Sequence, residues 1–132
     1  MIFSSDVVAG QLGYGNMNNL GNQVSEMGDY LPYVNLGTGR TVFQHSSGGS
    51  TCALLDSGEG KCWGGENSYG QLGKGNTDYL GDDPNEMGDY LATMLLGGGV
   101  VIDRFSLGSF ACCVITKQNR LKCWGLNAQG LF

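Results

Sequence analysis

Apolar residues along this chain fall in short runs that are separated by glycine-rich, polar turns. The runs contain many β-branched and aromatic residues, and none of them keeps a helical period. Turn-forming residues at 56–60 and 117–120 predict two hairpins. The pattern indicates an all-β chain with strands at 30–36, 41–46, 51–55, 60–64, 90–96, 100–106, 111–116 and 121–125.

The expected strands occur in two sets, because the sequence repeats itself. The segment GQLGYGN at 10–16 returns as GQLGKGN at 70–76, EMGDYL at 26–31 returns unchanged at 86–91, and KCWG at 61–64 returns at 122–125. A repeat of this length is typical of proteins in which each unit buries its apolar face on its neighbours. The polar stretches 14–29 and 74–89 are expected to be loops on one rim.

Alignment of the two units places Cys52 on Cys112. With one residue inserted near the following turn, it also places Cys62 on Cys123 and Trp63 on Trp124. Four short strands per unit fit the blade of a β-propeller. We therefore expect residues 1–132 to form a single repeat domain, with units at about 10–69 and 70–129. The predicted architecture is an incomplete β-propeller of two four-stranded blades and a short N-terminal stub.

Composition and charge narrow the possible partners. Glycine supplies 24 of the 132 residues, against an ordinary share of about 7 %, which fits many tight turns. The net charge is −5 without a basic cluster, so nucleic acid and anionic lipid are poor candidate partners. The uncharged stretch 90–102 is broken by glycines and too short for a membrane-spanning helix.

The segment 51–76 resembles the repeat of the regulator of chromosome condensation family. In that repeat a Trp-Gly pair is followed in order by an asparagine and a Gly-Gln-Leu-Gly turn. The resemblance covers nearly the whole chain. Within the family, the chain looks like a variant whose repeat unit is long and contains cysteines. The resemblance implies structural roles for Trp63, Gly64, Asn67, Gly70, Gln71, Leu72 and Gly73, and for Trp124, Gly125, Asn127 and Gly130 in the second copy.

The resemblance also implies a fold and a broad function. The family fold is a seven-bladed β-propeller, which two blades cannot close. The best-known member exchanges guanine nucleotide on a small nuclear GTPase through an inserted wedge, and this chain has no such wedge and no basic tail. The resemblance therefore implies an interaction scaffold and assigns no exchange activity.

Cysteines flank the predicted hairpin of each unit. Side chains that face each other on neighbouring antiparallel strands lie close to disulfide distance. We expect disulfides among Cys52, Cys62, Cys112 and Cys123, with buried free thiols as the alternative and a metal site as a remote one. Disulfides would favour an oxidising compartment, either the cell exterior or the lumen of an organelle. Cys113 is expected to pack against a neighbouring sheet.

Other candidate sites are weaker. His45 is the only histidine, and it has no partner in the motif for acid–base chemistry. The two tryptophans fit blade packing better than ligand stacking. The acidic loops at 78–86 and 86–89 match no calcium-loop spacing. We therefore expect no catalytic residue, no cofactor and no metal site.

These observations favour a non-catalytic protein-interaction or structural subunit that is docked in a larger assembly. An organellar or photosynthetic membrane complex is one such assembly. Other protein subunits are favoured as partners over copies of the chain, and no direct membrane span is expected. One alternative is a self-assembling or truncated propeller that acts as a binding module. The other is a fragment of a propeller like that of the exchange factor.

Overall fold

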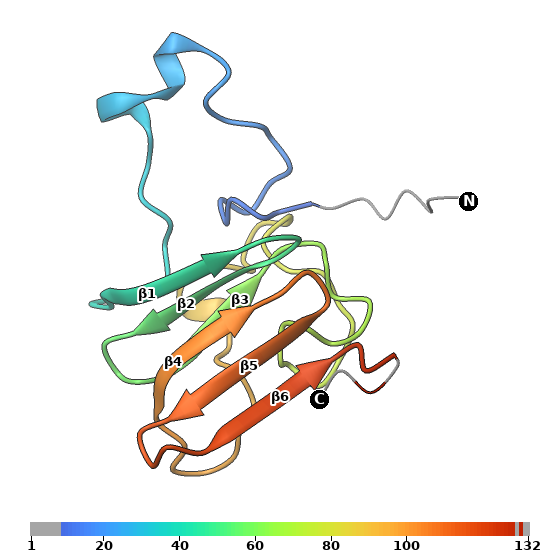
Figure 1. The fold of residues 1–132 in the computed structure, drawn as a ribbon. Coiled ribbons are helices and arrows are strands. Elements are labelled where there is room, and N and C mark those ends of the chain that lie inside the picture. The colour runs from blue at the N-terminus through green and yellow to red at the C-terminus, as the bar shows by residue number, and fades with distance from the viewer. Residues whose placement is uncertain (1–8, 129, 131–132) are drawn as a thin grey trace.

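The computed structural model describes residues 9–128 and 130, which form two stacked antiparallel sheets and almost no helix (Figure 1). Each sheet is an up-and-down meander of three strands. The all-β expectation is confirmed. The strands are β1 (Val42–Ser47), β2 (Thr51–Leu55) and β3 (Gly60–Trp63) in the first sheet, and β4 (Ile102–Leu107), β5 (Ala111–Thr116) and β6 (Leu121–Gly125) in the second.

Four-stranded blades are not confirmed, because the segments 30–36 and 90–96 contain no strand. They begin with the 3-10 helices η2 (Gly28–Tyr30) and η3 (Gly88–Tyr90), and η1 (Val24–Glu26) precedes η2. After η3, the amide of Met94 donates to Gly60 O at 2.8 Å, and the next amide, of Leu95, donates to Gly73 O at 2.8 Å. The Leu96 amide then folds back to bond to Met94 O at 3.2 Å, so each of these contacts is a single bond that is not continued into a ladder.

The two hairpins that join β2 to β3 and β5 to β6 share one turn geometry. The amide of Leu55 bonds to Glu59 O at 2.9 Å, and that of Thr116 bonds to Arg120 O at the same distance. Gly58 and Asn119 occupy the same turn position with φ of 78° and 58°. Glycine and asparagine are the residues that tolerate this left-handed conformation most readily. The two observed hairpin turns are therefore of equal length.

The one-residue insertion lies instead in the loop between β4 and β5. The amide of Gly48 closes the first loop on Ser50 O, whereas that of Gly108 closes the second on Ala111 O, one residue further along. The expected alignment placed this insertion after Cys112, at the β5–β6 turn. Its true position moves every residue of β5 by one place relative to β2.

The shift decides which cysteines pair. Cys52 faces Cys62 across β2 and β3, and the two form a disulfide with a Cα–Cα distance of 4.1 Å. In the second sheet the residue opposite Cys123 is Cys113, and this pair forms the second disulfide, also with Cα atoms 4.1 Å apart. The expected partner Cys112 is a buried free thiol opposite Trp124. The expectation for Cys112, and with it that for Cys113, was wrong.

The main core lies between the two sheets. It joins the Cys52–Cys62 disulfide and Leu54 of the first sheet to Phe105 and Val114 of the second. At one end, the amide group of Gln44 on β1 clasps the backbone of β4. Its Nε2 donates to Phe105 O at 2.8 Å, and its Oε1 accepts from the Phe105 amide at 3.3 Å. The clasp links the two sheets, because the side-chain amide of Gln44 bonds to both backbone groups of Phe105 as the backbone of a neighbouring strand would.

Candidate interaction surface

The repeated tryptophans attach the glycine-rich turns to the sheets. Trp63 Nε1 donates to Gln11 O at 2.9 Å, and Trp124 Nε1 donates to Gln71 O at 3.0 Å. A Cβ on Gly73 would lie 3.2 Å from the ring of Trp124, and one on Gly13 would lie 2.6 Å from Trp63 Nε1. Glycine at these positions lets the turn lie directly on the indole.

Asn67 organises the turn that follows the first sheet. Its Oδ1 accepts from the Leu72 amide at 2.9 Å, and its Nδ2 donates to Asn76 O and Asp78 O. The Gly73 amide closes the turn on Gly70 O, and both glycines have positive φ. Asn67, Gln71 and Leu72 are all fully buried. The sequence motif thus holds a structural joint.

The second copy of the motif ends at the limit of the described residues. Gly125 keeps a positive φ of 112°, as Gly64 does at 113°, and a Cβ on either glycine would collide with the neighbouring backbone. The amide of Gly130 bonds to Asn127 O at 3.3 Å, which matches the bond from Gly70 to Asn67. Residues 129 and 131–132 lie outside the described residues.

The two sheets differ in how their matching faces are covered. The face of the first sheet that carries Cys52, Leu54 and Cys62 is buried, with exposed fractions of 0 %, 5 % and 0 %. The second sheet covers it. The matching face of the second sheet carries Cys113, Ile115, Leu121 and Cys123, with Arg104 and Ser106 at its β4 edge, and we call it the outer face.

No described part of the chain buries the outer face. Cys113, Ile115 and Cys123 are only half-buried, and Leu121 is 66 % exposed. The opposite side of β5, with Cys112 and Val114, is fully buried. A face that is buried in one repeat is therefore open and largely apolar in the other, and such patches mark contact surfaces.

A second joint fastens the segment before β4 onto the first sheet. The amide of Gly88 donates to Asn35 O at 2.9 Å, and Lys61 Nζ donates to Leu36 O at 2.9 Å and to Gly88 O at 2.8 Å. Asp89 accepts from the backbone and hydroxyl of Thr38. Leu91 is 2 % exposed in a small core with Leu36 and Trp63.

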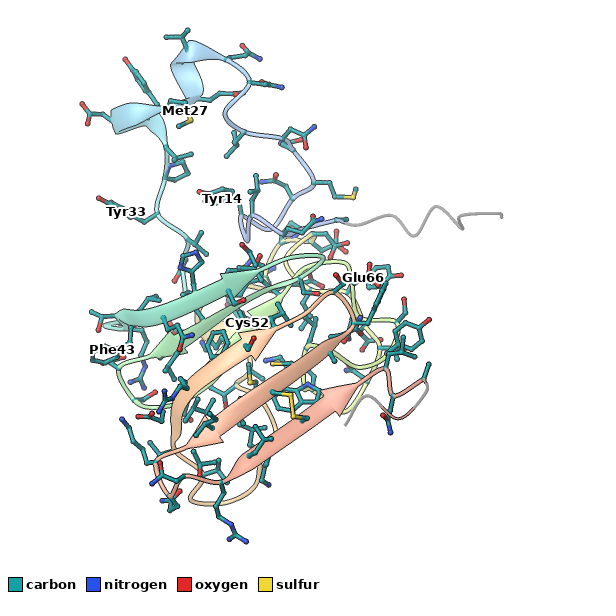
Figure 2. The ribbon with its side chains drawn as sticks, viewed as in Figure 1. Tyr14, Met27, Tyr33, Phe43, Cys52 and Glu66 are labelled. Carbon is teal, nitrogen blue, oxygen red and sulfur yellow. A yellow bond between two sulfur atoms is a disulfide. The ribbon has the colours of Figure 1, made fainter. Side chains whose placement is uncertain are left out.

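The corresponding segment of the first repeat stands away from both sheets up to its last residue, Val34, which packs against the small core around Leu36. We call residues 16–34 the free arm and residues 76–94 the docked arm. Figure 2 shows Met27 and Tyr33 on the free arm, far from the strands. Leu31, the counterpart of buried Leu91, is 39 % exposed. The free arm has its own internal bonds, since Glu26 Oε2 accepts from the amides of Gly21, Asn22 and Gln23.

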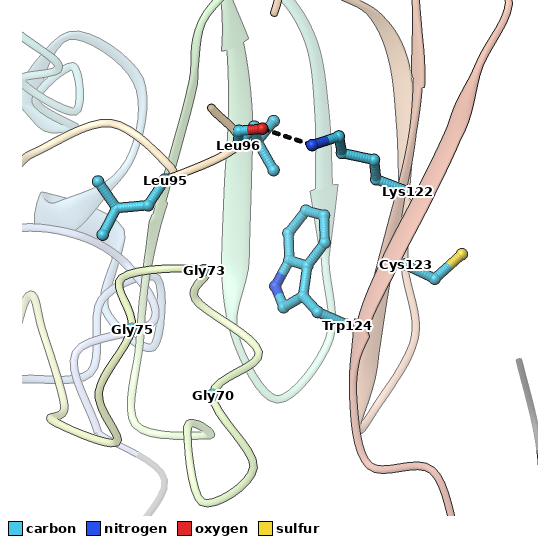
Figure 3. Close-up of a pocket in the computed structure, with 8 residues that line it drawn as sticks. All are labelled: Gly70, Gly73, Gly75, Leu95, Leu96, Lys122, Cys123 and Trp124. Atoms are coloured by element: carbon cyan, nitrogen blue, oxygen red, sulfur yellow. Dashed lines mark hydrogen bonds between the residues drawn. The ribbon is translucent and has the colours of Figure 1, made fainter. Parts of the chain in front are cut away.

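Beside β6 lies an open groove of about 460 Å³, lined mainly by Gly73, Leu95, Leu96, Lys122 and Trp124 (Figure 3). Lys122 Nζ donates to Leu96 O at 2.6 Å, as Lys61 donates to Leu36 O in the docked joint. The side chain of Cys123 points away from the groove. The groove and the outer face therefore lie on opposite sides of β6.

Electrostatics at the docked arm are set by two lysines, of which Lys61 is buried and Lys74 is half-buried. Burial lowers the pKa of Lys61, and the charge of Asp89 opposes this effect. Lys74, whose Nζ donates to Ala92 O, has a pKa lowered from 10.5 to about 8 by burial and by repulsion from Lys61. The bonds from Thr38 hold the pKa of Asp89 below its ordinary value. Burial also raises the pKa of the Cys112 thiol to about 12, so it is protonated at neutral pH.

The described residues contain no cluster of His, Cys, Asp and Glu side chains that could hold a metal ion. In the acidic loop, Glu86 Oε2 accepts from the amides of Gly81 and Asp83, which gives it a role in shaping the turn. His45 lies on β1 opposite Ala53. Across residues 9–128 no helix is long and apolar enough to cross a membrane.

Sequence reasoning missed the residues that make the arm joints. Lys61 and Lys122 were seen only as part of the repeated KCWG, and Glu26, Glu86 and Asp89 as rim acids. Their repetition was visible, since EMGDYL is identical in both units. The partners of these side chains are backbone carbonyls and amides, and such groups leave no signal in a sequence.

Comparison with known proteins identifies the repeat. Residues 102–130 match the family model of the regulator of chromosome condensation (RCC1) repeat, a stretch that contains all of β4, β5 and β6. No curated protein matches the chain. The matched stretch includes both the outer face and the residues Lys122 and Trp124 of the groove. Residues 102–130 are therefore similar to a repeat of the regulator of chromosome condensation type.

Proposed function

We propose that this chain is a non-catalytic, propeller-type interaction module whose outer face is covered by another protein in a larger assembly. The carrying observation is the contrast between two matching faces. Leu54 is 5 % exposed beneath the second sheet, whereas its counterpart Ile115 is half-buried beside Leu121, which is 66 % exposed. Burying such apolar area is the main driving force of association.

The cellular setting of this assembly is part of the proposal. The two cysteine pairs at disulfide distance are compatible with an oxidising compartment. The lumenal side of an organellar membrane complex, such as a photosynthetic one, provides that environment. The module would dock there through protein contacts.

The first test is native mass spectrometry on material isolated from the source without reducing agent. A mass above the 14.0 kDa of the single chain is expected. Ile115→Glu should remove the partner, because it places a charge in the middle of the outer face. Gln118→Glu, in the exposed β5–β6 turn, introduces the same charge outside this face and is the matched control. A partner that stays bound to Ile115→Glu and to the control equally would contradict the proposal.

A further inference from the structure

The docked arm joint is a template for a contact of which the described residues also show two unmatched halves. On one side, the free arm carries the same EMGDYL sequence as the docked arm but has no sheet beneath it. On the other side, the groove beside β6 has a lysine and a tryptophan in the places of Lys61 and Trp63 but holds no arm. The two half-joints are complementary.

We propose that the free arm of a second copy of this chain occupies the groove beside β6, so that copies associate head to tail. The inference goes beyond the proposed function: an arm seated there brings the first sheet of the second copy against the outer face, and the outer face of the last copy in such a row stays open for the other protein. Within one chain, the docked arm leads directly into the sheet that covers Cys52 and Cys62. The same connectivity in a second copy would cover Cys113 and Cys123.

The groove already holds its lysine in the required position. In the docked joint, Lys61 Nζ bonds to two carbonyls, Leu36 O on its own side and Gly88 O of the arm. In the described residues Lys122 Nζ bonds to Leu96 O, the counterpart of the first carbonyl. Gly28 O of an incoming arm is the counterpart of the second.

Exposed apolar residues of the first repeat match residues that the second repeat buries. Leu31 is 39 % exposed where Leu91 is 2 % exposed, and Val42 is 50 % exposed where Ile102 is 2 % exposed. Tyr30 and Tyr90 behave differently, since they are 76 % and 75 % exposed. Arm docking therefore buries the leucine and leaves the tyrosine in solvent.

Three positions show that the second joint is not a copy of the first. Asn35 is replaced by Leu95, which is 72 % exposed in the groove, and Thr38 is replaced by Gly98. Gln44 is replaced by Arg104. The new joint thus lacks the hydroxyl contact that Thr38 makes to Asp89 and gains apolar contact from Leu95. Leu95 would lie beside Gly28 of the incoming arm. A Cβ on Gly28 would meet no other atom within 4 Å.

The test is sedimentation equilibrium of the oxidised chain across a wide concentration range. The average mass should rise above 14.0 kDa with concentration. Leu31→Asp, in the arm, and Lys122→Met, in the groove, should each weaken association about tenfold or more. Tyr30→Asp and Lys117→Met are the matched controls, because they change the same charges outside the joint. Circular dichroism and thermal melting check that all four variants are folded.

A mixing experiment tests the head-to-tail geometry. Leu31→Asp retains an intact groove and Lys122→Met retains an intact arm, so an equimolar mixture should form a dimer and nothing larger. A reciprocal, symmetric exchange of arms would instead stop the wild-type chain at a dimer, whereas the head-to-tail contact lets it grow further. A wild-type chain that stays monomeric, variants that associate like the wild type, or a mixture without rescue would each overturn the second-copy proposal. The proposed function stands or falls separately, on whether Ile115→Glu removes a different protein from the native assembly.

Discussion

The two sheets have the same hairpins and equivalent disulfides, yet they live in different surroundings. In the first sheet β2 is buried on both faces, with Cys52, Ala53, Leu54 and Leu55 all inaccessible. In the second sheet β5 alternates between buried and half-buried residues along its length. The difference shows that each sheet has an apolar face that a neighbouring sheet must bury. The stability of a repeat unit therefore depends on which neighbours are present.

The largest contrast is expected between the two arms. Leu91→Ala should lower the free energy of unfolding by about 2–5 kcal/mol, because it leaves a cavity in a buried cluster. Leu31→Ala, at the matching site of the free arm, should change it by less than about 0.5 kcal/mol in the monomer. Urea denaturation at low protein concentration measures both. Equal losses would show that the free arm is packed as tightly as the docked one.

The disulfides should differ next. Each closes a loop of similar length, so either bond contributes about 2–3 kcal/mol to the free energy of unfolding by lowering the conformational entropy of the unfolded chain. Cys52→Ala/Cys62→Ala should cost more than Cys113→Ala/Cys123→Ala, because only the first pair lies in the core. In the folded wild type, a mild reductant should open Cys113–Cys123 first, as followed by alkylation and peptide mass mapping. Prior opening of the buried pair would be incompatible with the observed burial.

A pH effect should come from Lys74, which replaces Tyr14 of the first repeat. Its pKa is about 8 in the folded chain and 10.5 ordinarily, so the unfolded chain binds more protons between these values. Stability should therefore rise with pH from 8 to 10.5 and be flat below 8. The rise is at most about 3 kcal/mol. Urea titrations of wild type and Lys74→Met at each pH isolate it, and parallel curves for the two proteins would refute the assignment.

The smallest contrast is expected at two glycines in identical sequence. Gly28 and Gly88 both have φ of 68°, and a Cβ at Gly88 would lie 2.8 Å from Asn35, whereas at Gly28 it would meet nothing within 4 Å. Each alanine variant should lose about 1 kcal/mol to the left-handed backbone. Gly88→Ala should lose a few tenths more, because a flexible side chain must move. Thermal melts of the two variants compare them, and a greater loss at Gly28 would reverse the expected order.

The strands were predictable because they depend on local patterns. The runs around Cys52, Cys62 and Phe105 became strands within one or two residues of the expected bounds. The expected first strands failed because Met94 and Leu95 each make a single bond to another segment, and the Leu96 amide folds back to Met94 O. Such partners are a fact of tertiary structure. The pairing of Cys113 was missed because one residue in a loop cannot be placed by similarity when the neighbouring glycines and serines align equally well.

The candidate surface was predictable only in outline. Repetition and an apolar pattern indicated that some face needs a neighbour. Which face stays open depends on the position of Cys113 in β5, and so on the same loop residue. The arm joints depend on Lys61 and Lys122, whose partners are main-chain carbonyls. Lysines in a pattern that predicts strands are ordinarily assigned to the solvent.

The Gln44 clasp has a mechanical consequence. Its planar amide holds both the N–H and the C=O of Phe105, so the two bonds carry load together when one sheet slides on the other. A slip of one residue, about 3.4 Å along the strand, moves both groups out of reach at once. The two bonds therefore resist sliding and hold the sheets in one register. A force that separates the sheets from one edge instead breaks the apolar contacts one after another.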